Sequence, residues 1–233
     1  MIELYLGDCF EKLKEIPKGS VELIVCDPPY DISKSKGGGI AKYGCNKLLS
    51  NLIKSNIVDG YDIASFSELV KYLQTDINCY FWCNKRQIYE YMQAYVGKMK
   101  CKYDILSWHK TNVQATYYKK YLSDTEYILH FFKGKGTTHP QNYQDAHTYL
   151  VSPSTKSLNR KYGHPTIKPL DFTRRLIRNS SSKGGLVVDP FMGSGTTALA
   201  CLAEDRRFIG YEINKDFFEI ANRRVDEFKE NTI

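Results

Sequence analysis

The sequence predicts an α/β protein with a doubly wound, mostly parallel sheet and a region inserted into it. Short apolar runs of strand character alternate with helical stretches of about ten residues, which is the pattern of successive βαβ units. A chain of 233 residues with 42% apolar and 25% charged residues has the length and composition of one globular domain with an insertion. Together these observations indicate a Rossmann-like core.

Strands are expected where a short apolar run stops at a polar or turn residue. These runs are residues 2–6, 21–26, 78–83, 103–110, 126–132, 185–189 and 207–211. Helices are expected where apolar residues recur with helical spacing or a capping residue opens the segment. They are residues 8–16, opened by a capping box of Asp8 and Glu11, then 65–74, 85–97, 169–180, 195–205, and 214–228, capped by Asn214. The polar stretches 31–62 and 133–163 are expected to be loops.

Positive charge is concentrated in one part of the chain. Residues 98–183 hold 16 Lys or Arg and 5 Asp or Glu, whereas the remaining residues hold 17 and 21. Clustering of like charge does not stabilise a fold, but it suits a polyanionic partner such as nucleic acid. A solvated, lysine-rich surface would show the same pattern, so charge alone leaves both interpretations open.

Cysteine spacing and hydropathy disfavour metal sites and membrane insertion. The seven cysteines are an odd number without the paired C-x-x-C spacing of a zinc site, so no metal is expected. Buried thiols in a reducing compartment are the simpler interpretation. No apolar run reaches the ~18–20 residues of a membrane span, and the N-terminus lacks the pattern of an export signal. A cytoplasmic location is therefore expected.

A glycine-rich turn joins a predicted strand to a predicted helix at residues 189–197 (DPFMGSGTT). Glycines at such a turn let the backbone approach a ligand closely, and the helix N-terminus offers unpaired N–H groups. The third glycine of a dinucleotide fingerprint is absent. However, Glu212 ends the next strand about 20 residues on, where a carboxylate can bind both ribose hydroxyls of a nucleoside. A tight turn beside a surface acid is the alternative, but the pattern favours an adenosine-containing cofactor.

A second turn, Asp27-Pro28-Pro29-Tyr30, directly follows the apolar run at residues 21–26. The two prolines lack N–H groups and fix the backbone, so that neighbouring carbonyls point outward. A carboxylate and a rigid carbonyl can together accept both hydrogens of an exocyclic amine, and Tyr30 offers a flat face to the ring that carries it. A Pro-Pro turn that merely ends a strand would also account for this motif alone.

In this order, the two turns resemble the motifs of the β-class amino DNA methyltransferases, which use S-adenosylmethionine. That family has D-P-P-Y first, then a target-recognition insertion, then an H-P-x-x-K-P segment, and finally D-P-F-x-G-S-G-T-T. Here the H-P-x-x-K-P segment stands at residues 164–169 (HPTIKP). The resemblance covers residues 1–30 and 164–228 and is weak between them. It implies a catalytic and cofactor-binding domain at 1–111 and 164–233, with a basic target-recognition region inserted at 112–163.

The resemblance also implies roles for individual residues. The flipped base would be held by Asp27, Pro28, Pro29 and Tyr30. The cofactor would contact Asp8, Asp27, Lys168, Asp189, Phe191, Gly193, Ser194, Gly195, Thr196 and, at its ribose, Glu212. Asp8 suits a contact to the adenine amine and helix capping equally well. Lys168 either neutralises the cofactor carboxylate or is an exposed side chain, and His164 is expected to pack in its loop.

Phosphate contacts are expected from the basic region. The candidates are Lys119, Lys120, Lys133, Lys135, Lys156, Arg160 and Lys161. Four nearby tyrosines either stack on bases or pack onto the sheet: Tyr117, Tyr118, Tyr121 and Tyr143. The implied partner is double-stranded DNA, and the resemblance further suggests a homodimer and a cognate restriction enzyme.

The implied reaction is methyl transfer to the exocyclic amine of a flipped base. In the resembling family the motif usually begins with Asp for adenine N6 and with Ser for cytosine N4, so Asp27 favours adenine, with cytosine N4 as the alternative. Methylation of cytosine carbon 5 needs a Pro-Cys nucleophile, and no cysteine here follows a proline. Two other classes stay open: a nicotinamide-dependent dehydrogenase, and a DNA-binding module without catalysis.

Overall fold

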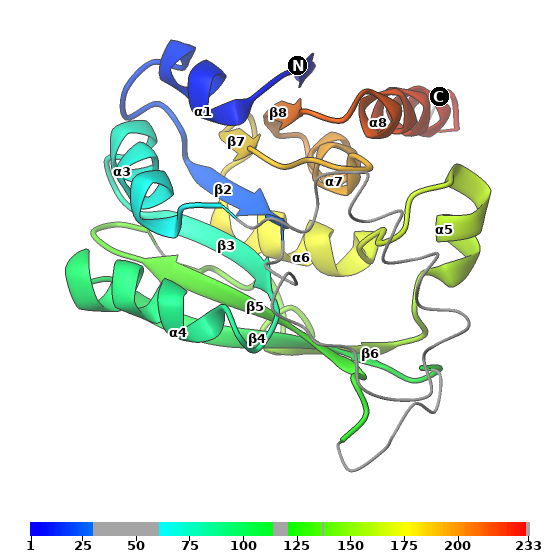
Figure 1. Cartoon of the computed structure of the whole chain (residues 1–233), viewed down its shortest axis with the longest axis horizontal. Coiled ribbons are helices and arrows are strands. Elements are labelled where there is room, and N and C mark those ends of the chain that lie inside the picture. The colour runs from blue at the N-terminus through cyan, green and yellow to red at the C-terminus, as the bar shows by residue number, and fades with distance from the viewer. Residues whose placement is uncertain (30–60, 114–120, 137, 232–233) are drawn as a thin grey trace.

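The computed structural model describes residues 1–29, 61–113, 121–136 and 138–231, whose strands form one eight-stranded sheet (Figure 1). Its strand order is β1-β8-β7-β2-β3-β5-β4-β6. The first five of these strands run parallel: β1 (Ile2–Leu6), β8 (Arg207–Glu212), β7 (Leu186–Asp189), β2 (Leu23–Cys26) and β3 (Asn78–Cys83). β5 (Thr125–Phe132) is antiparallel to β3 and to β4 (Lys102–Lys110), and β6 (Tyr149–Ser152) pairs parallel to β4. The doubly wound, mostly parallel sheet is confirmed.

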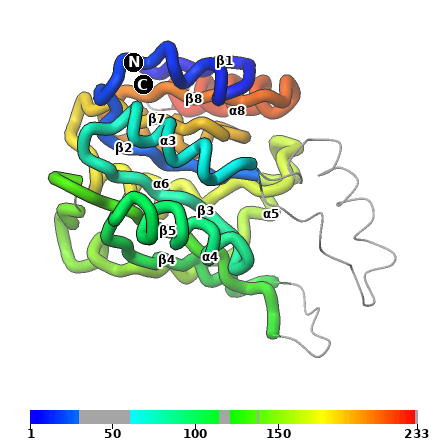
Figure 2. The backbone as a smooth tube through the Cα atoms, turned by 60° about the vertical axis from the view of Figure 1, so that its left-hand side comes forward, coloured from blue at the N-terminus to red at the C-terminus, as the bar shows by residue number. Residues whose placement is uncertain are grey.

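Helices cover both faces of this sheet (Figures 1 and 2). One face carries α1 (Cys9–Lys12), the 3-10 turn η1 (Leu13–Glu15), α3 (Ile63–Leu73), α4 (Ile88–Tyr91) and the π-helix η2 (Met92–Lys98). The other face carries α6 (Leu170–Ser180), α7 (Thr196–Ala203) and α8 (Lys215–Glu230). α5 (Lys156–Tyr162) packs beside α8, where Tyr162 donates a hydrogen bond to Glu227 at 2.7 Å.

Strict alternation along the central strands supplies an apolar surface to both layers. In β2, Ile24 and Cys26 belong to the core under α3, while Leu23 and Val25 belong to the core under α6 and α7. A parallel strand that is covered on both faces must be apolar at every position. This explains why residues 23–26 (LIVC) form a continuous apolar run.

Three local differences separate the structure from the sequence prediction. The segment 8–16 is split into α1 and η1 rather than being one helix. The predicted loop at 133–163 contains β6 and α5, which are hard to detect because they are only four and seven residues long and contain no buried residue. Residues 125–132 and 149–152, which lie within the predicted insertion 112–163, are strands of the main sheet.

Several sequence predictions fall outside the described residues. These are Tyr30, the expected loop at 31–60, Tyr117, Tyr118, Lys119 and Lys120. Among the described cysteines, all six are buried free thiols, as expected: Cys9, Cys26, Cys79, Cys83, Cys101 and Cys201. In the described ranges, no helix has the length and apolar character needed to cross a membrane.

Candidate active site

The glycine-rich turn and the Pro-Pro turn meet at the carboxyl edge of the sheet. β7 and β2 are parallel neighbours, so Asp189 and Asp27 leave the sheet side by side. Both turns line one cavity of about 430 Å³, which Asp8 and Glu212 also reach from the ends of β1 and β8. Two segments that are far apart in the sequence thus share one site.

The backbone of the glycine-rich turn adopts conformations that favour glycine. Gly193 and Gly195 have φ values of 50° and 76°, in the left-handed region. A Cβ atom on Gly193 would lie 3.2 Å from His164 Nε2, and one on Gly195 would lie 3.0 Å from the Cβ of Ala221. The turn therefore packs closely against its neighbours, and His164 is part of the cavity wall.

Asp189 stabilises this turn from within. Its Oδ1 accepts a hydrogen bond from Phe191 N at 3.0 Å, and its Oδ2 accepts one from Thr197 Oγ1 at 2.6 Å. Burial raises the pKa of Asp189 to about 7, although both hydrogen bonds favour the ionised form. This carboxyl group therefore titrates near neutral pH.

Glu212 links the end of β8 to the glycine-rich turn. Its Oε2 accepts a hydrogen bond from Gly193 N at 2.9 Å, and its Oε1 accepts one from Asn214 N at 2.8 Å. Burial raises the pKa of Glu212, and the two N–H groups oppose that shift. Because a carboxylate offers about four acceptor positions, Glu212 retains the capacity to receive hydroxyl groups of a nucleoside.

The side chains of Ser194 and Thr196 bind the protein itself. Arg224 of α8 donates to Ser194 Oγ at 2.8 Å and to Thr196 Oγ1 at 3.1 Å. Arg224 is only 4% exposed and anchors the turn on α8. Phe191 packs its ring against Tyr61, with centroids 5.2 Å apart, so an aromatic surface flanks the cavity.

Lys168 lies at the centre of the other half of the site. Its Nζ is 2.8 Å from Asp27 Oδ2 and 2.9 Å from Glu126 Oε2, and it sits 5.1 Å from the centroid of the Trp82 ring. The Lys168 side chain is 8% exposed, so the expectation of an exposed side chain is wrong. Its proximity to a cofactor carboxylate stays a prediction, but its charge is engaged by Asp27 and Glu126.

The ion pairs determine the charge state of this half of the site. Burial opposes ionisation of Glu126, but Lys168 and Lys110 outweigh it and lower the pKa of Glu126 to about 2. Burial also opposes the charge of Lys168, but Asp27 and Glu126 raise its pKa. Glu126 and Lys168 are therefore both ionised at neutral pH.

The Pro-Pro turn is supported by the segment that follows β3. Gln87 Nε2 donates a hydrogen bond to the Pro29 carbonyl at 3.3 Å, and Gln87 is only 5% exposed. Asn84 Oδ1 accepts from Gln87 N at 3.2 Å and so orders this support. The base-stacking role of Tyr30, which lies outside the described residues, stays a prediction.

Asp8 caps a helix and also lies in the cavity wall. Its Oδ1 accepts a hydrogen bond from Phe10 N at 2.8 Å and caps α1, while the residue also lines the cavity. The capping role is confirmed. The contact to an adenine amine stays a prediction.

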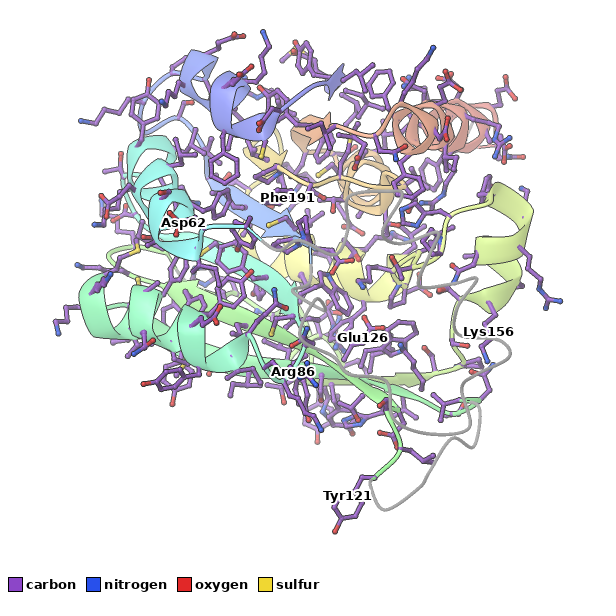
Figure 3. All side chains as sticks on the ribbon, viewed as in Figure 1. Asp62, Arg86, Tyr121, Glu126, Lys156 and Phe191 are labelled. Atoms are coloured by element: carbon purple, nitrogen blue, oxygen red, sulfur yellow. The ribbon has the colours of Figure 1, made fainter. Side chains whose placement is uncertain are left out.

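Three of the predicted phosphate contacts lie on α5, the helix that precedes a cavity-lining segment. Lys156, Arg160 and Lys161 belong to this helix, and Figure 3 shows Lys156 at its start. The segment after α5 contributes His164, Thr166 and Lys168 to the cavity wall. Lys161 also pairs with Glu227 of α8 at 3.0 Å.

Lys133 and Lys135 lie at the opposite edge of the sheet. They follow β5, whose last residue, Phe132, is paired with Asn78 at the beginning of β3. Lys133 Nζ donates to the Met99 carbonyl at 2.8 Å. The structure therefore does not bring these two lysines to the site, because the antiparallel direction of β5 carries the chain away from it.

Three residues that support the site were not predicted from the sequence: Glu126, Gln87 and Arg224. None belongs to a recognisable motif. Glu126 carries the one available signal, because it is an acid at the start of a mostly apolar run (EYILHFF). The sequence predicts the helix that carries Arg224 but does not reveal which residues Arg224 contacts.

Comparisons with known proteins agree with this geometry. Residues 21–223 match the sequence model of a family described as DNA methylase. Type II methyltransferase M.HpaI of Haemophilus parainfluenzae is 28% identical over 96% of this chain and 74% of its own length. DNA adenine methyltransferase YhdJ of Escherichia coli (strain K12) is 28% identical over 94% of this chain and 81% of its own length.

Solved structures share the same architecture. The M1.HpyAVI–SAM complex superposes with a TM-score of 0.68 at 26% identity, over 97% of this chain and 100% of that one. The cytosine-N4-specific PvuII DNA methyltransferase has a TM-score of 0.70 at 17% identity, which shows a shared fold alone. The family match covers most of the chain and includes both turns of the cavity. It excludes the alternative of a nicotinamide-dependent dehydrogenase. The protein belongs to the DNA methylase family and is an S-adenosylmethionine-dependent amino DNA methyltransferase.

Proposed function

We propose that this protein methylates the N6 amine of an adenine that is flipped out of double-stranded DNA at a specific sequence. The observation that carries the proposal is the convergence of Asp27-Pro28-Pro29 with the glycine-rich turn at one cavity. Two further facts support adenine. YhdJ is named a DNA adenine methyltransferase, and Asp27 stands where the resembling family usually has Asp for this base.

The cavity residues fit S-adenosylmethionine. A volume of about 430 Å³ lies within the range of small-molecule sites. Glu212 would hold the ribose, Asp8 the adenine amine, and Gly193 would allow close approach of the backbone. Phe191 and Tyr61 supply an aromatic surface. When bound, S-adenosylmethionine supplies an electrophilic methyl group.

Asp27 and the Pro28 carbonyl would orient and polarise the target amine. A stacked base cannot reach the cavity, so the base must be flipped out at a cost of a few kcal/mol. Each amine hydrogen then finds an acceptor, which turns the nitrogen lone pair toward the methyl group. The Asp27 carboxylate also stabilises the positive charge that develops on nitrogen. The extra proton is lost after transfer, so no strong base is required.

Identification of the methylated nucleoside tests this proposal. The protein is incubated with labelled S-adenosylmethionine and mixed-sequence DNA, and the DNA is digested to nucleosides. We expect all of the label in N6-methyldeoxyadenosine. Label in N4-methyldeoxycytidine would move the activity to the cytosine alternative, and no label above that of an Asp27→Ala control would leave a DNA-binding module without catalysis.

We place the DNA-binding surface at the carboxyl edge of the sheet, with target recognition in the segment 112–163. α5 contributes cations there, and Tyr121 projects away from the body of the protein with 97% of its surface exposed (Figure 3). Phosphate contacts position the duplex and base contacts select the sequence. Affinity from this surface should therefore depend on salt.

Two matched pairs of substitutions test this placement. Lys156→Ala with Arg160→Ala should lower the affinity for any DNA sequence about tenfold, because two phosphate contacts are lost. The slope of log affinity against log salt concentration should become shallower by about two. Lys133→Ala with Lys135→Ala removes the same charge from the opposite edge and should change neither quantity. Fluorescence anisotropy over a salt series measures both, and equal losses for the two pairs would contradict the placement.

Cofactor affinity should depend on pH through Asp189. Its pKa is raised to about 7, mainly by burial, and a cationic ligand favours the ionised form. Protonation therefore competes with binding below neutral pH, and affinity for S-adenosylmethionine should fall about tenfold between pH 8 and pH 6. Calorimetry measures this, with Asp189→Asn as the variant that cannot titrate; an equally steep loss in that variant would assign the effect elsewhere.

Two expectations about partners stay predictions. M.HpaI carries a type II methyltransferase name, in line with the expected cognate restriction enzyme for this chain. The other expectation is a homodimer, and sedimentation of the free protein measures its oligomeric state.

A further inference from the structure

Four charged side chains of alternating sign extend from the Pro-Pro turn across the sheet edge. The series runs from Asp27, directly after β2, through Lys168, before α6, and Glu126 of β5 to Lys110 of β4. Lys168 Nζ is 2.8 Å from Asp27 Oδ2 and 2.9 Å from Glu126 Oε2, while Lys110 pairs with the other Glu126 oxygen. Asp27 is thereby linked to a strand, β5, that lies two positions away in the sheet.

This network is largely removed from water. The exposed fractions of the four side chains are 23% for Asp27, 8% for Lys168, 22% for Glu126 and 18% for Lys110. The Trp82 ring lies near the Lys168 ammonium and extends the apolar surroundings. Desolvation of buried ion pairs costs about as much as their attraction returns, so stability alone does not explain the network. Its connection to Asp27 suggests a role in catalysis.

Charge balance shows what Glu126 would add. The amine nitrogen becomes positively charged during methyl transfer, and the Lys168 ammonium beside Asp27 would oppose that charge in surroundings of low dielectric constant. The Glu126 carboxylate contacts the same ammonium and offsets it. Lys110 in turn keeps Glu126 ionised, since it lowers the pKa of that carboxyl group together with Lys168.

We propose that Glu126 is a positioning residue for methyl transfer, which acts through Lys168. It fixes the Lys168 ammonium against the Asp27 carboxylate and cancels its charge, so that Asp27 remains an effective acceptor for the amine. This inference rests on the proposed function above. It assigns a role in the reaction to a strand that carries none of the sequence motifs.

A double-mutant cycle on the full-length protein tests the proposal. Glu126→Gln should lower the single-turnover rate of methyl transfer to DNA on the order of 30- to 100-fold. Calorimetry should show its affinity for S-adenosylmethionine changed by less than about threefold. In a Lys168→Met background, the same Glu126→Gln change should alter the rate by no more than about threefold, because residues in one network are not additive.

Two further variants separate this role from a structural one. Glu204→Gln removes a buried acid that pairs with Arg174 and Arg178 away from the cavity, and it should leave the rate unchanged. Glu126→Asp keeps the charge and should recover at least about a third of the lost rate on a logarithmic scale. It also serves as the test variant if thermal melting shows that Glu126→Gln is unfolded.

The outcomes are distinguishable. A Glu126→Gln effect of equal size with and without Lys168, or one that appears entirely in cofactor affinity, overturns the positioning role. A Glu126→Asp variant as slow as Glu126→Gln overturns the charge-based explanation in the same way. If the unchanged protein transfers no methyl group to any DNA, the proposed function itself fails.

Discussion

Asp27→Ala is expected to slow methyl transfer on the order of 1,000-fold while cofactor binding changes by no more than about threefold. The substitution removes the carboxylate that accepts an amine hydrogen. It also deprives the Lys168 ammonium of a carboxylate partner that lies 2.8 Å away in the unchanged protein. Both changes oppose the positive charge that develops on the amine nitrogen. A single-turnover assay with labelled cofactor measures the rate, and calorimetry measures the binding.

The matched control for this variant is Asp226→Ala. Asp226 lies on the surface of α8, where it pairs with Lys229 at 3.6 Å, and its loss should leave the rate unaltered. A rate for Asp27→Ala within about tenfold of the unchanged protein would remove Asp27 from the amine-acceptor role. A parallel collapse of cofactor affinity would instead assign it to the cofactor.

Glu212→Ala is expected to weaken S-adenosylmethionine binding about 100-fold. Hydrogen bonds to a charged carboxylate contribute about 1.5–3 kcal/mol each, and a ribose would form up to two of them. The variant also leaves the Gly193 and Asn214 N–H groups without their acceptor, so part of the loss would come from the turn itself. Affinity by calorimetry is the direct measurement.

A cofactor analogue without the ribose 2′-hydroxyl separates these two contributions. In the unchanged protein the analogue should bind about tenfold more weakly than S-adenosylmethionine, because a charged hydrogen bond is lost. In Glu212→Ala the two should bind alike. Equal discrimination in both proteins would mean that Glu212 supports the turn without contacting the ribose.

The sequence predicts the catalytic half of this protein well because its signals are local. A buried parallel strand must be apolar along its length, so β2 and β7 are visible as continuous runs. The turns after them contain Pro or Gly at positions where backbone geometry demands those residues. Parallel neighbours then bring Asp27 and Asp189 to the same edge without further information.

The sequence does not reveal contacts that depend on strand direction or on partners from distant elements. Lys133 and Lys135 belong to a basic segment, but the antiparallel course of β5 takes them to the far edge of the sheet. The sequence around Lys168 is compatible with an exposed side chain. In the structure this side chain is buried and contacts Asp27 and Glu126. β6 and α5 are too short, at four and seven residues, for a period to be recognised in the sequence.

A structure of the protein bound to a non-reactive cofactor analogue and a target duplex would show whether Asp27 contacts the flipped base. The distance to measure is the one between the flipped amine nitrogen and the Asp27 carboxylate. We expect a hydrogen bond of about 2.7–3.2 Å between these two groups. The group of the analogue that replaces the methyl-bearing sulfur should lie on the side of the nitrogen away from the carboxylate. A base seated away from Asp27, or an analogue whose reactive end points away from the Pro-Pro turn, would contradict this expectation.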